Sequence, residues 1–174
     1  MSKLVFLMSV TLASPAWSQD HSGFYLGGDV SVFETRYENL TIEGDGTALG
    51  IHAGYRYVID SSVFIEGEGF AATINGGTND GSIDFESYYG LTIGAGAYLL
   101  NNFYGLFFAG IANINSEDVD FGSRKDDGII LGLGVGYDIT PEHSVGLRCS
   151  IISVDGAFGY IDTDVLAIRY SYHF

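Results

Sequence analysis

The histidines, serines and carboxylates are the residues of this sequence whose chemistry could support hydrolysis. A serine-type hydrolase needs a serine, a histidine and a carboxylate that meet at a cleft. The chain has four histidines, of which only His52 lies well inside a regular segment, whereas His21, His143 and His173 lie near segment ends. No His-x-Ser pattern accompanies them. We therefore predict that the protein is not an enzyme and that His52 is a packed interior residue.

A run of carboxylates is the second feature with chemical potential, because carboxylate oxygens are ligands for Ca²⁺. Its members are Glu117, Asp118, Asp120, Asp126 and Asp127. Their spacing differs from that of an EF-hand loop. We interpret the segment from Glu117 to Asp127 as a solvated acidic loop, and the sequence leaves open whether it binds divalent cations. The glycine-rich segment 75–81 lacks the lysine and the following helix of a phosphate-binding loop, so no cofactor is predicted.

A third set of charges lies inside segments that otherwise alternate between apolar and small residues. A buried charge is stable only when it is paired. We therefore predict a polar network in the interior of the protein, with arginines opposite carboxylates; the alternative is that these are solvated charges on a soluble barrel. The predicted members are Asp29, Arg56, Glu66, Glu68, Asp138, Arg148 and Arg169.

Alternation with a period of two residues identifies the elements that carry these charges, because successive side chains of a β-strand point to opposite faces. The clearest segments are 49–57, 89–99, 129–139 and 165–174, and four more are 24–37, 63–73, 103–112 and 145–154. Leu106, Phe107 and Phe108 are consecutive, so the phase of that segment is ambiguous. The pattern predicts an all-β protein with eight strands.

The connections between these segments alternate in length. Those around 59–62, 100–102 and 140–143 are short, whereas those at 38–47, 74–86, 113–127 and 155–162 are longer and polar. This layout is typical of an antiparallel up-and-down transmembrane β-barrel. The second face of each strand is rich in Gly, Ser, Thr and Ala, which suits the crowded lumen of a narrow barrel. No stretch has the roughly eighteen unbroken apolar residues of a transmembrane helix.

The tyrosines offer a further prediction, because aromatic residues form girdles at membrane interfaces. Many lie near the ends of the predicted strands, and we expect them in such girdles. They are Tyr37, Tyr57, Tyr88, Tyr98, Tyr104, Tyr137, Tyr160 and Tyr172.

The N-terminal segment has the features of a cleavable signal peptide. Lys3 precedes a short apolar run at 4–13, and Pro15 and the small-residue pattern Ala16-Trp17-Ser18 follow it. We predict a signal peptide at residues 1–18 and a mature barrel domain at residues 19–174. A single cysteine, Cys149, excludes an internal disulfide. The net charge of −15 argues against nucleic acid as a partner.

The C-terminal strand carries the most specific signal. Ile168, Tyr170, Tyr172 and Phe174 alternate with polar residues up to the last position, and this resembles the assembly signal of outer-membrane proteins. The segments 23–28 (GFYLGG) and 64–69 (FIEGEG) are also similar to those of OmpA-like, OmpX-like and opacity-type eight-stranded barrels. The chain ends where the barrel ends, so we expect no peptidoglycan-binding domain.

The resemblance implies a location and a set of partners. We expect a protein of the bacterial outer membrane, with both termini periplasmic and the long loops extracellular. It implies contact with outer-membrane lipid and lipopolysaccharide, and recognition of the C-terminal strand by the barrel-assembly machinery.

The leading functional hypothesis is a non-enzymatic outer-membrane barrel with a structural or surface-interaction role of the adhesion type, whose acidic loops contact an extracellular ligand. The alternative is a narrow channel for ions or small hydrophobic molecules. A third hypothesis is a soluble periplasmic binder of the lipocalin type, which the terminal signal and the apolar outward faces disfavour.

Overall fold

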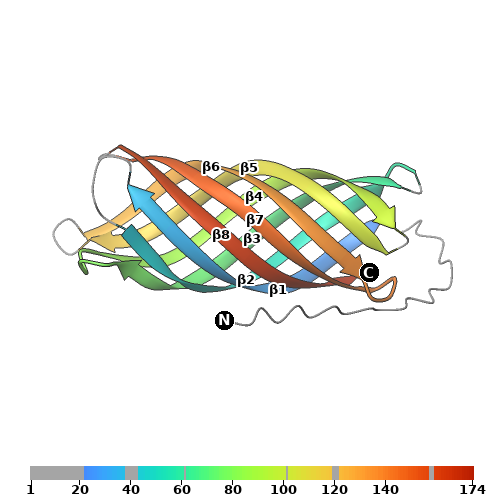
Figure 1. The fold of residues 1–174 in the computed structure, drawn as a ribbon, viewed down its shortest axis with the longest axis horizontal. Helices are drawn as coiled ribbons and strands as arrows, with labels where there is room; N and C mark the ends of the chain where they lie inside the picture. Colours follow the sequence, from blue (N-terminus) through green and yellow to red (C-terminus); the bar gives the residue numbers. More distant parts are fainter. Residues whose placement is uncertain (1–21, 38–42, 61, 101, 119–121, 157–158) are drawn as a thin grey trace, which may run out of the picture.

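The structure is a computed structural model that describes residues 22–37, 43–60, 62–100, 102–118, 122–156 and 159–174. All regular structure in these ranges is β-strand, which confirms the predicted all-β class. The strands are β1 (Gly23–Tyr37), β2 (Glu43–Val58), β3 (Val63–Thr78), β4 (Ile83–Leu100), β5 (Phe103–Asp118), β6 (Gly122–Asp138), β7 (His143–Gly156) and β8 (Gly159–His173) (Figure 1).

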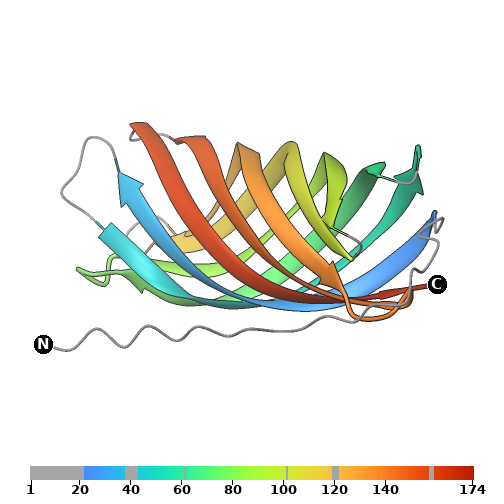
Figure 2. The same cartoon turned by 45° about the vertical axis from the view of Figure 1, so that its right-hand side comes forward.

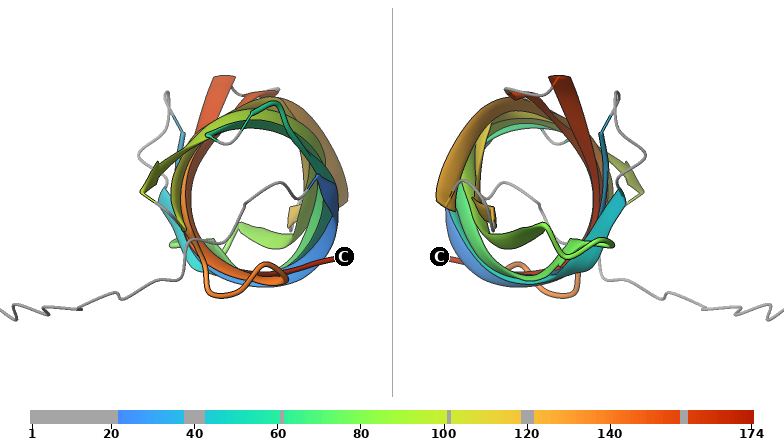
Figure 3. Two further views of the ribbon diagram at one scale, coloured as in Figure 1. Left: turned by 90° about the vertical axis from the view of Figure 1, so that its right-hand side faces the viewer. Right: turned by 90° about the vertical axis from the view of Figure 1, so that its left-hand side faces the viewer.

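The strands form a closed antiparallel barrel in chain order, in which β8 returns to pair with β1. Figure 3 looks along the barrel and shows the closed ring, and Figure 2 shows how strongly the strands tilt as they wrap around it. Closure leaves the sheet without the unpaired edges that an open sheet would present to lipid. The predicted eight-stranded barrel is confirmed. Within the described ranges, no helix is long and apolar enough to cross a membrane.

The two ends of the barrel differ. The first and last described residues meet at one end, where the backbone N–H of Phe174 donates to the carbonyl of Phe24 at 2.9 Å. The short connections β2–β3, β4–β5 and β6–β7 lie at the same end, which we call the turn end; the opposite end is the loop end. In the β2–β3 turn, hydrogen bonds from Ser62 and Val63 lower the pKa of the exposed Asp60 carboxyl. The predicted signal peptide lies outside the described residues.

Apolar side chains cover the outside of the barrel wall. Ile93 and Phe24 are 68% and 67% exposed to the surroundings, whereas inward-pointing Phe64 is fully buried. The ambiguous phase of β5 is resolved in the same way, since Phe107 points outward and Phe108 inward. An exterior of this kind is stable only against lipid or another apolar surface.

Inside the barrel, large rings face glycines on the adjacent strand. A side chain at Gly132 would collide with the Phe108 ring, and one at Gly96 would collide with the Phe64 ring. The lumen therefore holds its aromatic residues only because the neighbouring strand contributes no side chain at the same level. The pairs are Tyr25 with Gly54, Phe33 with Gly46, His52 with Gly27, Phe64 with Gly96, Phe70 with Gly90, Tyr104 with Gly136 and Phe108 with Gly132.

Three tyrosines that we expected in the interfacial girdles belong to this interior instead. Tyr88 and Tyr104 are buried, and Tyr98 packs against Phe64 and Tyr104. The prediction was wrong for them because position near a strand end says nothing about the face, which alternation decides. Tyr57 and Tyr172 do point outward. The side chains of Tyr37 and Tyr160 lie outside what the structure describes.

The lumen has two layers of different character. Toward the turn end it contains the arginines and glutamates described below, and toward the loop end it is filled by an apolar cluster that includes Phe33, Phe85, Ile114, Ile152 and Val154. Transmembrane barrels more often have a polar interior throughout. At this level the lumen is closed by ordinary hydrophobic packing.

The long loops expected from the sequence are shorter than predicted. β5 continues to Asp118 and β6 begins at Gly122, so most of the predicted loop 113–127 is a paired hairpin, and the same holds for 74–86, where β3 ends at Thr78 and β4 begins at Ile83. Apart from inward-pointing apolar residues such as Phe85 and Ile114, these arms are largely polar, which resembles a loop in the sequence, yet their backbone groups remain paired between strands.

The ring-against-glycine packing predicts unequal effects of two matched substitutions. In Gly132→Ala the new methyl group meets the Phe108 ring and the Cys149 carbonyl oxygen, the latter at 2.7 Å. We expect a loss of about 1–3 kcal/mol in the free energy of unfolding, measured by urea titration in lipid or micelles. Gly67→Ala is the control, because no atom lies within 4 Å of its added methyl group. It should be neutral or stabilise by up to about 1 kcal/mol, and equal losses in the two variants would contradict this packing.

Candidate functional site

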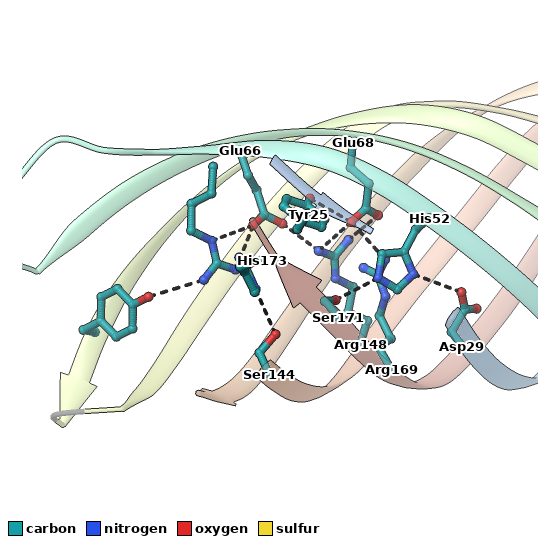
Figure 4. Close-up of polar contacts among 12 residues, drawn as sticks. Tyr25, Asp29, His52, Glu66, Glu68, Ser144, Arg148, Arg169, Ser171 and His173 are labelled. Carbon is teal, nitrogen blue, oxygen red and sulfur yellow. Dashed lines mark hydrogen bonds and ion pairs between the residues drawn. The ribbon is translucent and has the colours of Figure 1, made fainter. Parts of the chain in front are cut away.

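Five of the predicted interior charges form one layer of ion pairs across the lumen, shown in Figure 4. Arg56 of β2 donates to Glu66 of β3, its register partner, from Nε at 3.2 Å and Nη2 at 3.0 Å. Arg148 of β7 donates to Glu66 Oε1 at 2.6 Å and to Glu68 Oε1 at 2.9 Å. Arg169 of β8 donates to Glu68 Oε2 at 2.9 Å. Because β3 and β7 stand on opposite walls of an eight-stranded ring, Arg148 spans the lumen.

The layer is shielded from water. The side chains of Glu66 and Glu68 are each 3% exposed, and that of Arg148 is 15% exposed. Aromatic rings support the cations, with the Arg56 guanidinium 4.1 Å from the centroid of Phe64 and that of Arg148 4.9 Å from Phe108. Charges at such burial are stable only when every partner stays in place.

A second chain of contacts lies beside this layer and was not predicted. His52 Nδ1 lies 3.4 Å from Asp29 Oδ2, and His52 Nε2 lies 2.8 Å from Ser171 Oγ. Two glycines make room for it, because side chains at Gly27 and Gly50 would collide with His52 and Asp29. Asp29 is thus paired with a histidine, although we expected an arginine; its register partner Arg169 donates to Glu68 instead.

Asp138 lies at the turn end of the lumen and reaches the ion-pair layer through a tyrosine. The Tyr98 hydroxyl donates to Asp138 Oδ2 at 2.9 Å, and Arg56 Nη1 donates to the Tyr98 hydroxyl at 3.4 Å. The other carboxylate oxygen, Oδ1, has no hydrogen-bond partner among the described residues. The expected direct pairing of Asp138 with an arginine is therefore absent from the part of the chain described.

Two tyrosines belong to the polar network although they were not among its predicted members. The hydroxyl of Tyr25 donates to Glu68 Oε2 at 2.9 Å, and Tyr98 links Arg56 to Asp138. The alternation contained the signal, because Tyr25 falls on the same face of β1 as Asp29. Tyr98 was predicted to be an interfacial residue, and Tyr25 was not assigned a role.

His52 contacts the Asp29 carboxylate with one ring nitrogen and the Ser171 hydroxyl with the other, as the histidine of a hydrolytic triad does. Hydrolysis would also require space for a substrate beside Ser171. Ser171 lines a cavity of about 20 Å³ on the turn side of the ion-pair layer. Another cavity of about 50 Å³ lies on its loop side and is lined by Asp29 and Thr92. Such volumes hold one or a few waters and no acyl substrate. The arrangement thus holds a buried histidine in a hydrogen-bonded network.

The acidic segment near the loop end shows no assembled metal site in its described residues. No group of three or more potential ligands gathers anywhere in the described ranges, and Asp126 accepts from Arg124 Nε at 2.8 Å. Asp120 lies outside the described residues.

The residues of the predicted assembly signal all point outward from β8. Ile168, Tyr170, Tyr172 and Phe174 are between 38% and 76% exposed. Tyr172 and Phe174 pack edge to face with centroids 5.0 Å apart, and the Tyr170 hydroxyl is hydrogen-bonded to His143 Nδ1 at 2.6 Å. The end of β8 therefore presents a ladder of aromatic side chains at the turn end.

Comparison with known proteins agrees with this architecture. A family model described as "Outer membrane protein beta-barrel domain" matches residues 4–174. Solved structures with the same fold include the Neisserial surface protein A, NspA (20% identity, 88% of this chain and 98% of that chain, TM-score 0.63). They also include Ail, the attachment invasion locus protein of Yersinia pestis (16% identity, 87% of this chain and 100% of that chain, TM-score 0.55). A third is OprG of Pseudomonas aeruginosa (14% identity, 90% of this chain and 98% of that chain, TM-score 0.50). No curated protein sequence matches significantly.

Because the ion-pair layer is buried, we predict that its central cation, Arg148, contributes far more to the free energy of unfolding than an exposed arginine that also contacts two carboxylates. Arg148→Met leaves Glu66 and Glu68 with one arginine each, and we expect a loss of about 3–5 kcal/mol in the free energy of unfolding. The matched control is Arg36→Met, since Arg36 also contacts two carboxylates but is 58% exposed. That change should leave the free energy of unfolding nearly unchanged, because water screens ion pairs between exposed side chains. Chemical denaturation of both variants in the same lipid decides the matter, and similar losses would refute the buried layer.

Proposed function

The chain belongs to the family of outer membrane protein β-barrel domains, and we propose that it is a closed anchor in the bacterial outer membrane whose loop end contacts an extracellular partner. The observation that carries this proposal is the filled lumen. The ion-pair layer and the apolar cluster occupy successive levels of the interior, so the barrel offers its outer surface and its rim for function.

The distribution of residues on the outer wall supports an orientation. On β1 the outward face is free of charge from Phe24 to Val32, a length that matches the roughly 9–11 residues of a tilted membrane strand. Charged outward residues follow at the loop end, among them Glu34, Asp45 and Asp164. We infer that the turn end, with both chain ends, faces the periplasm, since short turns are periplasmic in such barrels.

The charge of the rim limits the chemistry of the partner. The sequence has a net charge of −15, and the only basic residues on the described loop-end arms are Arg36, Arg124 and Lys125. One structure of Ail contains sucrose octasulfate, a heparin analogue. A polyanion of that kind would be repelled by this rim unless divalent ions bridged the charges. Proteins or lipopolysaccharide with bridging cations fit the rim better.

The outward aromatic ladder of β8 supports recognition by the barrel-assembly machinery during insertion. Its four side chains are accessible along the final strand, which is an edge until the barrel closes onto β1.

The channel alternative has one observation in its favour. The cavities of about 50 and 20 Å³ lie on opposite sides of the ion-pair layer, and Arg148 and Arg169 line both. A passage between them would require these ion pairs to break. The soluble lipocalin-type hypothesis is disfavoured, because family membership implies the outer membrane.

Removal of the last aromatic residue tests the assembly role. In Phe174→Ala we expect most of the chain to fail to reach the folded, heat-modifiable form in outer-membrane fractions. Phe107→Ala removes an outward aromatic ring from β5 and serves as the control; it should assemble nearly as well as the unaltered protein. Normal assembly of Phe174→Ala would remove the support for recognition through β8.

Planar-bilayer recordings separate the anchor from the channel. The unaltered protein should show no discrete conductance steps, because Arg148 and its carboxylate partners cross the lumen. The double variant Glu68→Ala/Arg148→Ala removes the centre of the layer and should admit measurable ion leakage in lipid where it remains folded. Regular steps from the unaltered protein would favour the channel and overturn the anchor.

A further inference from the structure

A groove crosses the outer wall of the barrel from the apolar band toward the loop end. Its volume is about 790 Å³, and outward-pointing residues of β5 to β8, β1 and β2 form most of its lining. Sites for small molecules have volumes of roughly 300–1,000 Å³ and are mostly apolar with a few polar groups. The groove has the size of such a site, so the side chains along it determine what could bind.

The apolar part of the groove follows one row of side chains across the strands. The row consists of Phe107, Leu133, Cys149, Leu166 and Val32, which lie on β5, β6, β7, β8 and β1 and face one another in register. All five point outward and are exposed. Cys149 is the smallest of them and stands between two leucines, so the row has a hollow at its centre.

A second row, next to the first, changes from apolar to acidic along its length. Leu131 faces Ile151, and Ile151 faces Asp164. Asp164 then faces Glu34 of β1, and Glu34 faces Asp45 of β2. Because the strands tilt, as Figure 2 shows, the row runs obliquely from the middle of the wall to the loop end. The groove therefore has an apolar part within the membrane band and three carboxylates at its outer end.

The acidic end of the groove carries more negative charge than its own cation balances. Arg36 contacts Asp164 at 3.0 Å and Glu34 at 3.5 Å. In its own row Arg36 is flanked by two further carboxylates, those of Glu43 and Asp162. Like charges that face each other across strands repel, and one guanidinium cannot neutralise all of these groups. This end of the groove therefore attracts positive charge.

We propose that the groove binds a cationic lipopeptide from the extracellular side, with its ammonium groups on the carboxylates and its acyl chain along the apolar rows. The apolar part favours a tail, and the excess of carboxylates favours a head with several positive charges. The groove lies on the outer wall, so this inference goes beyond the rim contact proposed above and does not depend on it.

The lipids of the membrane itself fit the groove less well. A phospholipid or lipid A would bring its phosphate groups against the carboxylates and would need bridging metal ions. No group of three or more potential metal ligands gathers among the residues that the structure describes. Ammonium groups, in contrast, pair with separate carboxylates directly.

The test uses the full protein in nanodiscs of dimyristoyl phosphatidylcholine, with empty nanodiscs as the background. The probes are lauroyl-tetralysine, acetyl-tetralysine and lauroyl-tetraglutamate, and isothermal titration calorimetry measures their binding. We expect saturable binding above background for lauroyl-tetralysine alone, because the groove requires both the tail and the positive charge. Binding of acetyl-tetralysine with the same affinity would assign the carboxylates to polycations without a tail and would overturn the proposal.

Two pairs of neutralising substitutions locate the head group. Glu34→Gln/Asp164→Asn removes two carboxylates of the groove and should weaken binding of lauroyl-tetralysine about ten-fold, as the loss of two surface ion pairs would. Asp84→Asn/Glu86→Gln removes the same charge from exposed residues of β4 outside the groove and should leave the affinity unchanged. Equal affinities of the two double variants would show a general attraction to the acidic rim and contradict the site.

Two matched substitutions locate the tail. Cys149→Leu fills the hollow of the apolar row and should weaken binding of lauroyl-tetralysine several-fold. Ala95→Leu makes the same kind of change at an exposed position of β4 outside the groove and should have no effect. Heat-modifiable gel mobility shows whether each variant is folded. If folded Cys149→Leu binds as tightly as Ala95→Leu, the acyl chain does not occupy the groove and the proposal is wrong.

Discussion

The narrowness of the lumen is the constraint on which the rest of the structure depends. Eight strands enclose a space just wide enough for their own side chains. Each large inward residue therefore needs an empty place opposite, as Phe108 has at Gly132 and Phe64 has at Gly96. The high glycine content, 25 of 174 residues, follows from this constraint as well as from the turns.

The same constraint makes the buried charges mutually dependent. Glu66 and Glu68 project inward from β3, where, among the described residues, the arginines of β2, β7 and β8 form ion pairs with them. Removing water from these groups is costly, and the ion pairs, the Tyr25 hydroxyl and the ring contacts of Arg56 and Arg148 offset that cost together. Because the ion pairs that stabilise this layer span the lumen, they also close it. The function proposed above accordingly lies at the surfaces of the barrel.

The sequence predicted the strands and their inward charges because alternation reports the face of each residue. It did not predict which partners meet across the lumen, since that depends on the register and tilt of strands distant in the chain. Asp29 meets His52 and Asp138 meets Tyr98, although alternation placed arginines on the same face. The arms of β5 and β6 resemble a loop in the sequence, because their many polar residues give no sign that the backbone is paired.

The central claim is that ion pairs close this barrel at the level of Arg148. A crystal structure of the protein in a lipidic phase would test it most directly, through the contacts of that guanidinium. We predict that Arg148 lies within hydrogen-bonding distance of both Glu66 and Glu68, with no continuous line of water through the layer. An Arg148 side chain turned to one wall, beside an open water-filled passage, would contradict it.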